Sequence, residues 1–180
     1  ADVAIGVLAV TDPVDLKING SDAPHDATIV EDGALDLKAL LTASFQDLDG
    51  SEHRDIIISN PAGNGTILVN GNAVAAGASY TIAWNAAGNT LETSQTGFPA
   101  ISIAPGANFS GDLNGITVTL SAKDTDSDSS VTTLTQSDSV TLNLHVTPVA
   151  GDVTAPNVST AEDTAVKFLQ NVALTDTDGS

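Results

Sequence analysis

The sequence predicts an all-β protein, an antiparallel β-sandwich that is repeated along the chain. Three observations lead to this prediction. Apolar and polar residues alternate with a period of two, short apolar stretches are separated by Gly, Pro and Asn, and one motif recurs at a domain-sized spacing. Alternation is typical of strands with one buried face, and frequent turn residues between short strands are typical of sandwiches.

The clearest strands lie at 116–122 and 140–147, where Val, Ile, Leu or Ala alternates with Thr, Ser, Asn or His. We expect the apolar set to point inward and the polar set outward. Further strands are expected at Asp55–Ser59, Thr66–Asn70, Ser79–Trp84 and Ala100–Ile103. Gly33–Phe45, in which three leucines could share a face, is predicted to be a strand with a short helical turn.

A second copy of one segment closes the chain. Ser21–Ser51 and Val153–Ser180 each contain Ala-Pro, then Glu-Asp, then an apolar stretch, then Asp-x-Asp-Gly-Ser. The Asp-x-Asp pairs are 176 − 47 = 129 residues apart, a domain-sized spacing. We therefore predict the end of a preceding repeat and a linker at 1–17, a complete sandwich at 18–150, and the start of the next repeat at 151–180. Neither end segment can bury a core alone, so we expect the two either to fray or to pair with each other.

The charge balance is strongly acidic, with 23 Asp and Glu against 5 Lys and Arg and a formal net charge of −18. Such a surface attracts cations and repels nucleic acid and anionic lipid, so no nucleic-acid partner is expected. No run of apolar residues is long enough for a membrane-spanning helix, and the N-terminus lacks the pattern of a signal peptide, so membrane insertion is not expected either.

The acidic residues gather in short loop-like stretches, at Asp47–Glu52, Asp124–Asp128, Glu162–Asp163 and Asp176–Asp178. Clustered carboxylates repel one another, and with so few basic residues the natural counter-ions are divalent cations such as Ca²⁺. Asp47, Asp49 and Glu52 flank Gly50 in the first candidate site, and Asp-x-Asp-x-Asp opens the second stretch; neither has EF-hand spacing. The alternatives stay open: Asp-Gly suits a plain turn, and the second stretch suits a solvated hairpin loop.

The order of several short motifs resembles a known family. The motifs are "AEDTAV…L…LTDTDGS", "PGANFSGD", "ITVTLSAKDTD" and a closing "LHVTPV". In this order they resemble the Ig-like or cadherin-like tandem repeats of giant bacterial repeats-in-toxin (RTX) adhesins. The resemblance implies an Ig-like, Greek-key sandwich that acts as a calcium-stiffened extender in a fibre exported by type I secretion. It also implies an extracellular place on the bacterial surface, where such fibres attach cells to one another, to hosts or to surfaces in biofilms.

The resemblance implies partners and a ligand set as well. The partners are neighbouring repeats of the same chain, with outside surfaces contacted through other domains. A module of this type completes the calcium shell of its first site with distant groups, such as Glu31 and Asp124 or Asp126. The full set of candidate ligands is Glu31, Asp47, Asp49, Glu52, Asp124, Asp126, Asp128, Glu162, Asp176 and Asp178.

Other functions are less well supported by the sequence. No nucleophile motif, phosphate-binding glycine loop or paired histidine spacing occurs, so an enzyme is not expected. The alternative is a calcium-dependent, lectin-like ligand-binding module of the same kind of adhesin. Tyr80 and Trp84 are its candidates for sugar stacking, although both also suit a sandwich core.

Overall fold

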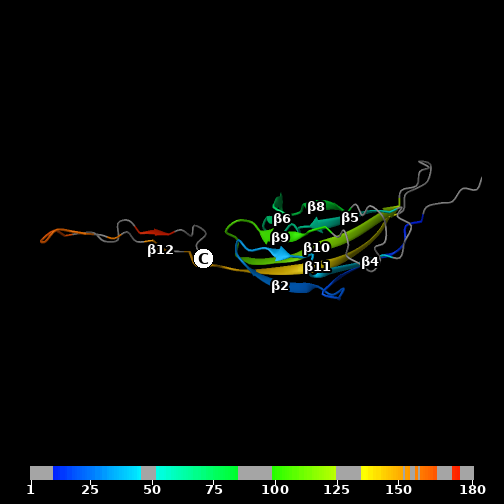
Figure 1. Ribbon diagram of the computed structural model, residues 1–180, viewed down its shortest axis with the longest axis horizontal. Helices are drawn as coiled ribbons and strands as arrows, with labels where there is room; N and C mark the ends of the chain where they lie inside the picture. The colour runs from blue at the N-terminus through cyan, green and yellow to red at the C-terminus, as the bar shows by residue number, and fades with distance from the viewer. Residues whose placement is uncertain are drawn as a thin grey trace, which may run out of the picture.

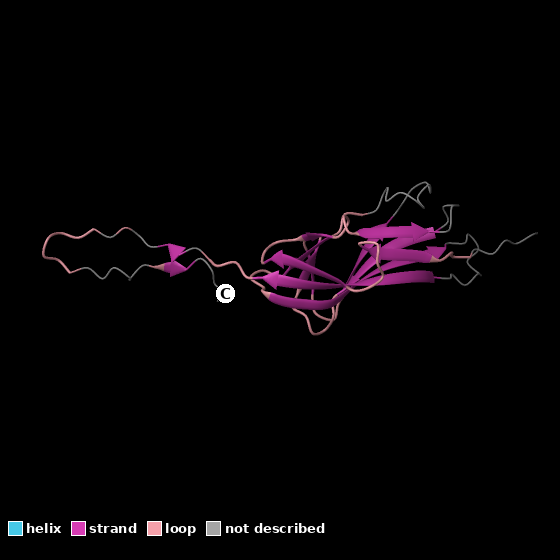
Figure 2. Cartoon of the chain, turned by 90° about the horizontal axis from the view of Figure 1, so that it is seen from below, coloured by secondary structure: helices cyan, strands magenta, loops and turns pink. Residues whose placement is uncertain are grey.

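The computed structural model describes residues 10–45, 52–84, 99–124, 135–151, 153–154, 157, 159–165 and 172–174. These residues form strands, turns and loops, and none of them is helical, so the predicted all-β class is confirmed (Figure 2). The strands are β1 (Val14–Ile18), β2 (His25–Val30), β3 (Leu35–Asp36), β4 (Leu41–Phe45), β5 (Glu52–Ser59), β6 (Ile67–Val69), β7 (Asn72–Val74), β8 (Ser79–Trp84), β9 (Ser102–Pro105), β10 (Gly111–Asp124), β11 (Thr135–Thr147), β12 (Val153–Thr154) and β13 (Ala173–Leu174). With no helix described, no membrane-spanning helix is found among these residues.

Two sheets face each other across an aliphatic core (Figure 1). One sheet has the strand order β2-β11-β10-β5-β8, the other has the order β3-β9-β6-β7, and β1 pairs with β4 beside them. Neighbouring strands are antiparallel except for β2 and β11, which run parallel. The architecture is a β-sandwich.

The core follows the alternation read from the sequence. Val118 and Leu142 are fully buried, whereas their neighbours Thr117 and Thr141 face the outside of the sheet and are register partners. Leucine, isoleucine and valine from both sheets supply most of the buried side chains. A core of branched aliphatic residues suits a pleated, half-buried surface.

Several boundaries differ from those expected. β10 starts before the alternating stretch, because a register shift between Leu113 and Ile116 lets its pairing with β11 continue across a bulge at Gly115, whose φ is 71°. β11 also starts earlier than expected, at Thr135. β9 starts two residues later than expected. β2 and β7 were not among the expected strands, since both are short and contain His, Asp or Asn.

Gly33–Phe45 forms the expected combination of strand and helical turn. β3 and β4 flank a single turn in which the Leu41 N–H donates to the Leu37 carbonyl oxygen at 3.0 Å. This i to i−4 bond is that of an α-helix, and it brings the leucines of the turn toward the core.

The N-terminal boundary lies earlier than residue 18. β1 pairs with β4 from Val14–Phe45 to Ile18–Leu41, and Leu16 and Ile18 are buried in the core. The structure therefore groups 14–18 with the sandwich. β12 pairs with β13 rather than with β1, so the described residues of the two end segments do not pair with each other.

The chain crosses the sandwich from end to end. β1, β2 and β11 all run in the same direction, because Leu16 hydrogen-bonds Asp138 near the start of β11 and β2 follows the second half of β11 in parallel register. We call the end with Val14, Glu52 and Asp124 the amino pole, and the end with Val30 and Thr147 the carboxyl pole. Figure 1 shows the chain arriving on the right, at the amino pole, and leaving on the left, at the carboxyl pole.

The second copy of the motif repeats local geometry of the first. Gly33 N–H donates to Val30 O at 3.0 Å and Thr164 N–H to Ala161 O at 3.2 Å, closing two turns with the sequences Val-Glu-Asp-Gly and Ala-Glu-Asp-Thr. The third residue of each is left-handed, with φ of 57° at Asp32 and 62° at Asp163. Asp tolerates this conformation better than most residues.

The position of one strand is repeated too. β4 ends at Phe45, two residues before Asp47, and β13 ends at Leu174, two residues before Asp176. Phe45 pairs with Val14 and Leu174 pairs with Val153 in the β12–β13 ladder, so β13 occupies the place of β4. Val153 lies 163 − 153 = 10 residues before Asp163, whereas Val14 lies 32 − 14 = 18 residues before Asp32, so β12 is not the counterpart of β1. Figures 1 and 2 show this short ladder beyond the carboxyl pole of the sandwich.

A matched pair of substitutions tests the inward and outward faces of β11. We expect Leu142→Ala to lower the free energy of unfolding by about 2–5 kcal/mol, because it leaves a cavity in a fully buried position. Thr141→Ala, one residue away on the outer face, should change it by less than about 1 kcal/mol. Chemical denaturation of both variants measures the difference, and equal losses would contradict the described orientation of β11.

Candidate functional site

Glu52 and Asp124 meet at the amino pole. Glu52 begins β5, Asp124 ends β10, and the two are register partners across the ladder. Phe45 and Thr135, which flank the two predicted acidic segments on their other sides, belong to the same half of the sandwich. The backbone therefore brings the flanks of both segments together, as a shared metal site requires.

Six of the predicted ligands lie outside the described residues, namely Asp47, Asp49, Asp126, Asp128, Asp176 and Asp178. For Glu52 and Asp124 the structure describes the backbone but not the side chain. Within the described part of the chain, no three His, Asp or Glu side chains lie close enough to hold a metal ion. Calcium binding at the amino pole thus stays a prediction.

The structure separates Glu31 from that pole. Glu31 follows β2, and its N–H donates to the Thr147 carbonyl oxygen at 2.9 Å, at the carboxyl pole. Thr135 and Thr147 are the two ends of β11, 147 − 135 = 12 residues apart, which corresponds to about 40 Å. Calcium ligands lie about 2.3–2.6 Å from the ion. Glu31 therefore cannot share an ion with Asp124 of the same repeat, and that part of the expected ligand set is wrong.

Glu162 occupies the turn that matches Glu31 in the second copy. It is exposed, and it precedes the left-handed Asp163 as Glu31 precedes Asp32. The two Glu-Asp pairs are thus equivalent positions of a turn, which explains their recurrence without a metal ion.

A buried cation lies under the amino pole. Arg54, the only arginine of the chain, is 3% exposed, and its guanidinium carbon lies 3.9 Å from the centre of the Phe45 ring. Phe45 in turn packs edge-on against Trp84, with ring centres 5.1 Å apart. Guanidinium groups stack on aromatic faces in this way. The cluster closes the core at the amino pole and places one fixed positive charge beside the acidic end of the sheet.

A further basic group on β1 is neutralised locally. Lys17 Nζ donates to Asp15 Oδ2 at 2.6 Å, and this hydrogen bond raises the pKa of Lys17 above its ordinary value. It therefore stays charged across the neutral range. Since both side chains are largely exposed, the pair contributes little to stability.

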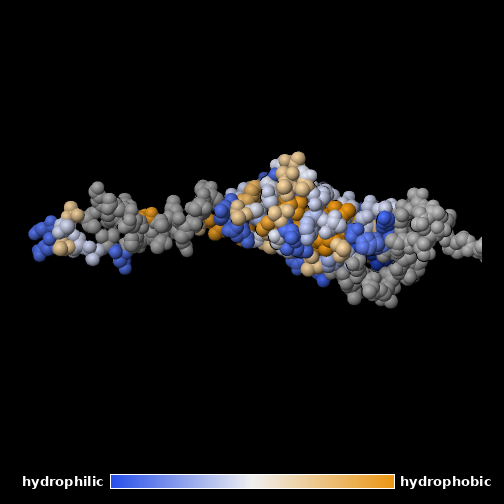
Figure 3. Space-filling view, turned by 90° about the horizontal axis from the view of Figure 1, so that it is seen from above, coloured by the Kyte–Doolittle hydropathy of each residue, from blue (hydrophilic) through white to orange (hydrophobic). Residues whose placement is uncertain are grey.

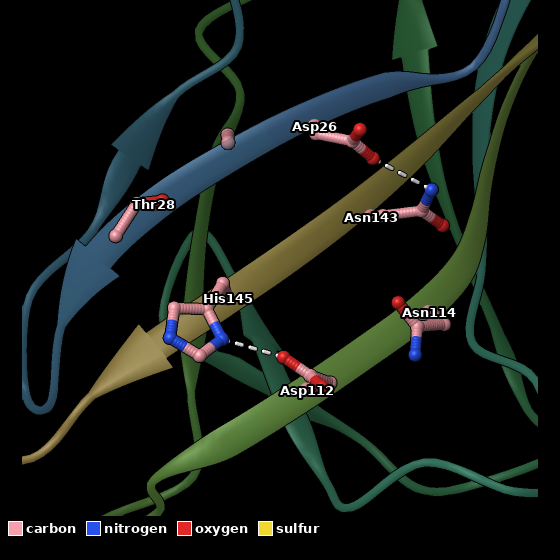
Figure 4. A pocket seen from close by; sticks show the side chains of 7 residues that line it. Asp26, Thr28, Asp112, Asn114, Asn143 and His145 are labelled. Atoms are coloured by element: carbon pink, nitrogen blue, oxygen red, sulfur yellow. Dashed lines mark hydrogen bonds and ion pairs between the residues drawn. The ribbon is translucent and has the colours of Figure 1, made fainter.

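A polar hollow lies on the outer face of the larger sheet, in the half next to the carboxyl pole (Figure 4). It has a volume of about 270 Å³. Strands β2, β10 and β11 line it with Asp26, Ala27, Thr28, Asp112, Asn114, Asn143 and His145.

Three interactions order this hollow. Asn143 Nδ2 donates to Asp26 Oδ1 at 2.9 Å, while Asn143 Oδ1 accepts from the Gly115 N–H at 2.9 Å. His145 Nδ1 lies 2.5 Å from Asp112 Oδ1. Figure 4 shows the Asp26–Asn143 contact between β2 and β11 and the His145–Asp112 contact between β11 and β10. Small-molecule pockets are usually concave and largely apolar, whereas this hollow is open and polar, so its geometry favours strand-to-strand ties over ligand binding.

Sequence reasoning found half of this network. It placed Asn143 and His145 on the outer face of a strand, which the structure confirms. It did not find their partners, because no strand was expected at Asp26, in β2, or at Asp112, at the start of β10. The alternation of Asp26, Thr28 and Val30 with Ala27 and Ile29 was the available signal.

No protein-family model matches this chain, and neither does any curated protein.

The separation of the two poles makes a prediction about calcium affinity. We expect Asp124→Asn to weaken calcium binding at the amino pole at least tenfold, since it removes a charge beside Glu52. Glu31→Gln, which removes the same charge at the opposite pole, should leave that affinity within about twofold. Isothermal titration with CaCl₂ compares the two, and equal losses would contradict the assignment of the site to the amino pole.

Proposed function

We propose that this chain is a section of a tandem array: one Ig-like, calcium-stabilised extender repeat with parts of its neighbours. The array would form the stalk of a large secreted bacterial surface adhesin and support cell-surface adhesion and biofilm formation. One observation carries the proposal. The backbone enters the sandwich at one pole and leaves it at the other, so that successive repeats extend a fibre instead of folding back on it.

The repeated local geometry supports the array. The left-handed Asp32 and Asp163 are 163 − 32 = 131 residues apart, close to the spacing of the Asp-x-Asp motifs. β13 takes the place of β4, since each ends two residues before an Asp-x-Asp motif. A new repeat thus begins only five residues (148–152) after β11 ends.

The distribution of exposed apolar side chains also supports end-to-end contact. Among the described residues, the exposed large hydrophobic side chains are Val10 (63%), Val30 (53%), Val149 (47%) and Val172 (39%). Val10 precedes β1, Val30 and Val149 lie at the carboxyl pole, and Val172 adjoins β13. None lies on the flank of the sandwich, where Figure 3 shows hydrophilic residues interspersed with apolar ones. Val10, Val30 and Val149, which lie at the ends of the sandwich, suit burial between consecutive repeats.

The acidic residues give calcium a role in this array. Glu52 and Asp124 mark the amino pole as strongly acidic, and the carboxyl pole carries Glu31 and Asp32. In an array the carboxyl pole of one repeat faces the amino pole of the next. Glu31 would then be near Asp176 and Asp178 at the amino pole of the next repeat. It would be far from Asp47 and Asp49 of its own repeat.

The lectin-like alternative is less well supported. Trp84 is 3% exposed and packs on Phe45, and the Tyr80 hydroxyl is held by Asn72 Nδ2 at 3.0 Å. Neither ring is presented as a flat exposed surface for sugar stacking. The polar hollow lies in the half of the sheet away from Asp124, so a ligand bound there would not bridge to calcium at the amino pole.

Melting curves in calcium and in chelator test the proposal. Calcium that binds only the folded form at a thousandfold excess over Kd adds about 4 kcal/mol, which corresponds to a rise in melting temperature on the order of 10 °C. The rise should be much smaller in Asp49→Ala and unchanged in Asp22→Ala, an exposed carboxylate outside the acidic segments. Trp84, the only tryptophan, lies at the amino pole, so its fluorescence should report the same titration.

Coincident melting curves in calcium and in excess chelator would overturn the calcium part of the proposal. Asp-x-Asp-Gly-Ser would then be a turn sequence only.

A further inference from the structure

We propose that the parallel pair of β2 and β11 is a tension-bearing clamp, which gives the polar hollow on the outer face a mechanical function. The proposal rests on the proposed function only for the presence of tension along the fibre. The clamp itself follows from strand direction and from named contacts.

The first step is the path of the load. A pull on the two ends of a repeat draws β1 and β2 toward the amino pole and draws β11 toward the carboxyl pole. β2 is bonded directly to β11, from His25–Leu142 to Val30–Thr147. The β2–β11 ladder is therefore the direct connection between the N-terminal strands, which are pulled one way, and β11, which is pulled the other way.

The second step is the direction of the load on each bond. The pull lies along both strands, while the ladder hydrogen bonds run between the strands. All register pairs of β2 and β11 must then yield together. If the same ladder were pulled apart at one end, its bonds would yield one after another, each under the full load. The two strands are parallel, and force acts on the N-terminal end of β2 and the C-terminal end of β11, at opposite poles. The ladder is therefore loaded in shear, and a ladder in shear withstands a higher force than one that is peeled from one end.

The third step is the set of side-chain ties across this ladder. Asn143 and Asp26 are register partners and are joined by their side chains at 2.9 Å. Near the carboxyl pole, Thr147 Oγ1 donates to the Ile29 carbonyl oxygen at 3.2 Å, and the Glu31 N–H donates to the Thr147 carbonyl oxygen at 2.9 Å. Each tie connects β2, or the residue that follows it, to β11, so each is strained when the strands slide.

The fourth step is the anchor behind β11. Asn143 Oδ1 accepts from the Gly115 N–H on the bulge of β10, and His145 contacts Asp112 on the same strand. Figure 4 shows Asn143 pointing from β11 toward Asp26, with the His145–Asp112 contact on the side of β10. Polar contacts thus connect β2 to β11 and β11 to β10 along the hollow. Through them, force on β2 is transmitted to β10 in the middle of the sheet.

The test is single-molecule pulling of the full chain at constant force. The chain has no cysteine, so Val10→Cys with Ala150→Cys attaches handles before β1 and after β11, both at exposed positions. Ala34→Cys with Ala150→Cys attaches both handles near the carboxyl pole and peels the ladder from one end. At the same force, the axial pair should give a lifetime at least tenfold longer than the peeling pair.

Substitutions locate the resistance. Asn143→Ala removes both side-chain ties of that amide, and the axial lifetime should fall about tenfold. Asp26→Ala, at an exposed position that does not bear on folding of the core, should give a loss in the same direction. Asn64→Ala is the control, because Asn64 also ties two segments, through Asn60 and the Asn114 backbone, but lies off the path between β2 and β11. Its axial lifetime should stay within about twofold.

Equal losses in Asn143→Ala and Asn64→Ala, or equal lifetimes in axial and peeling pulls, would overturn the clamp. Repeating the axial series in calcium and in chelator separates this outcome from failure of the proposed function. A protein without calcium dependence would still show the difference between Asn143→Ala and Asn64→Ala if the clamp is present.

Discussion

The pairing of β10 with β11 is the constraint on which the rest of the structure depends. These two strands are the longest, and together they contribute Val118, Leu120, Leu142 and Leu144 to the fully buried core. Because strand side chains alternate strictly, a slip of one residue in this ladder would turn the whole apolar set outward. β5 and β2 then align on opposite sides of the pair, each over one half of its length, so the register of the long ladder also sets where the two poles lie.

The sequence was most informative where a single physical cause acts. Burial on one face alone dictates the alternation in 116–122 and 140–147, and those residues were assigned to the correct faces. β2 was missed because the stretch looks polar in sequence. Asp26 and Thr28 face the solvent, and the residues between them are only partly buried, since β2 is an edge strand. The bulge at Gly115 was missed because one extra residue leaves no periodic signal.

The candidate site shows a similar division. Sequence spacing placed acidic residues in turns, and the structure brings Glu52 and Asp124, which border two of those stretches, into register. Spacing alone could not show that Glu31 lies at the carboxyl pole. A residue that follows a strand lies at one end of the sheet or the other, and the strand direction decides which. The parallel course of β2 beside β11 decides this, and parallel neighbours leave no mark in the sequence of either strand.

The length of β11 has a consequence for the size of a fibre. Each repeat spans from pole to pole by roughly the extent of this one strand, about 40 Å for its twelve residue steps. If consecutive repeats are joined by connectors as short as 148–152, duplication of a repeat lengthens the fibre by a nearly constant increment. The length of such a fibre would then be set by the number of repeats that the gene encodes.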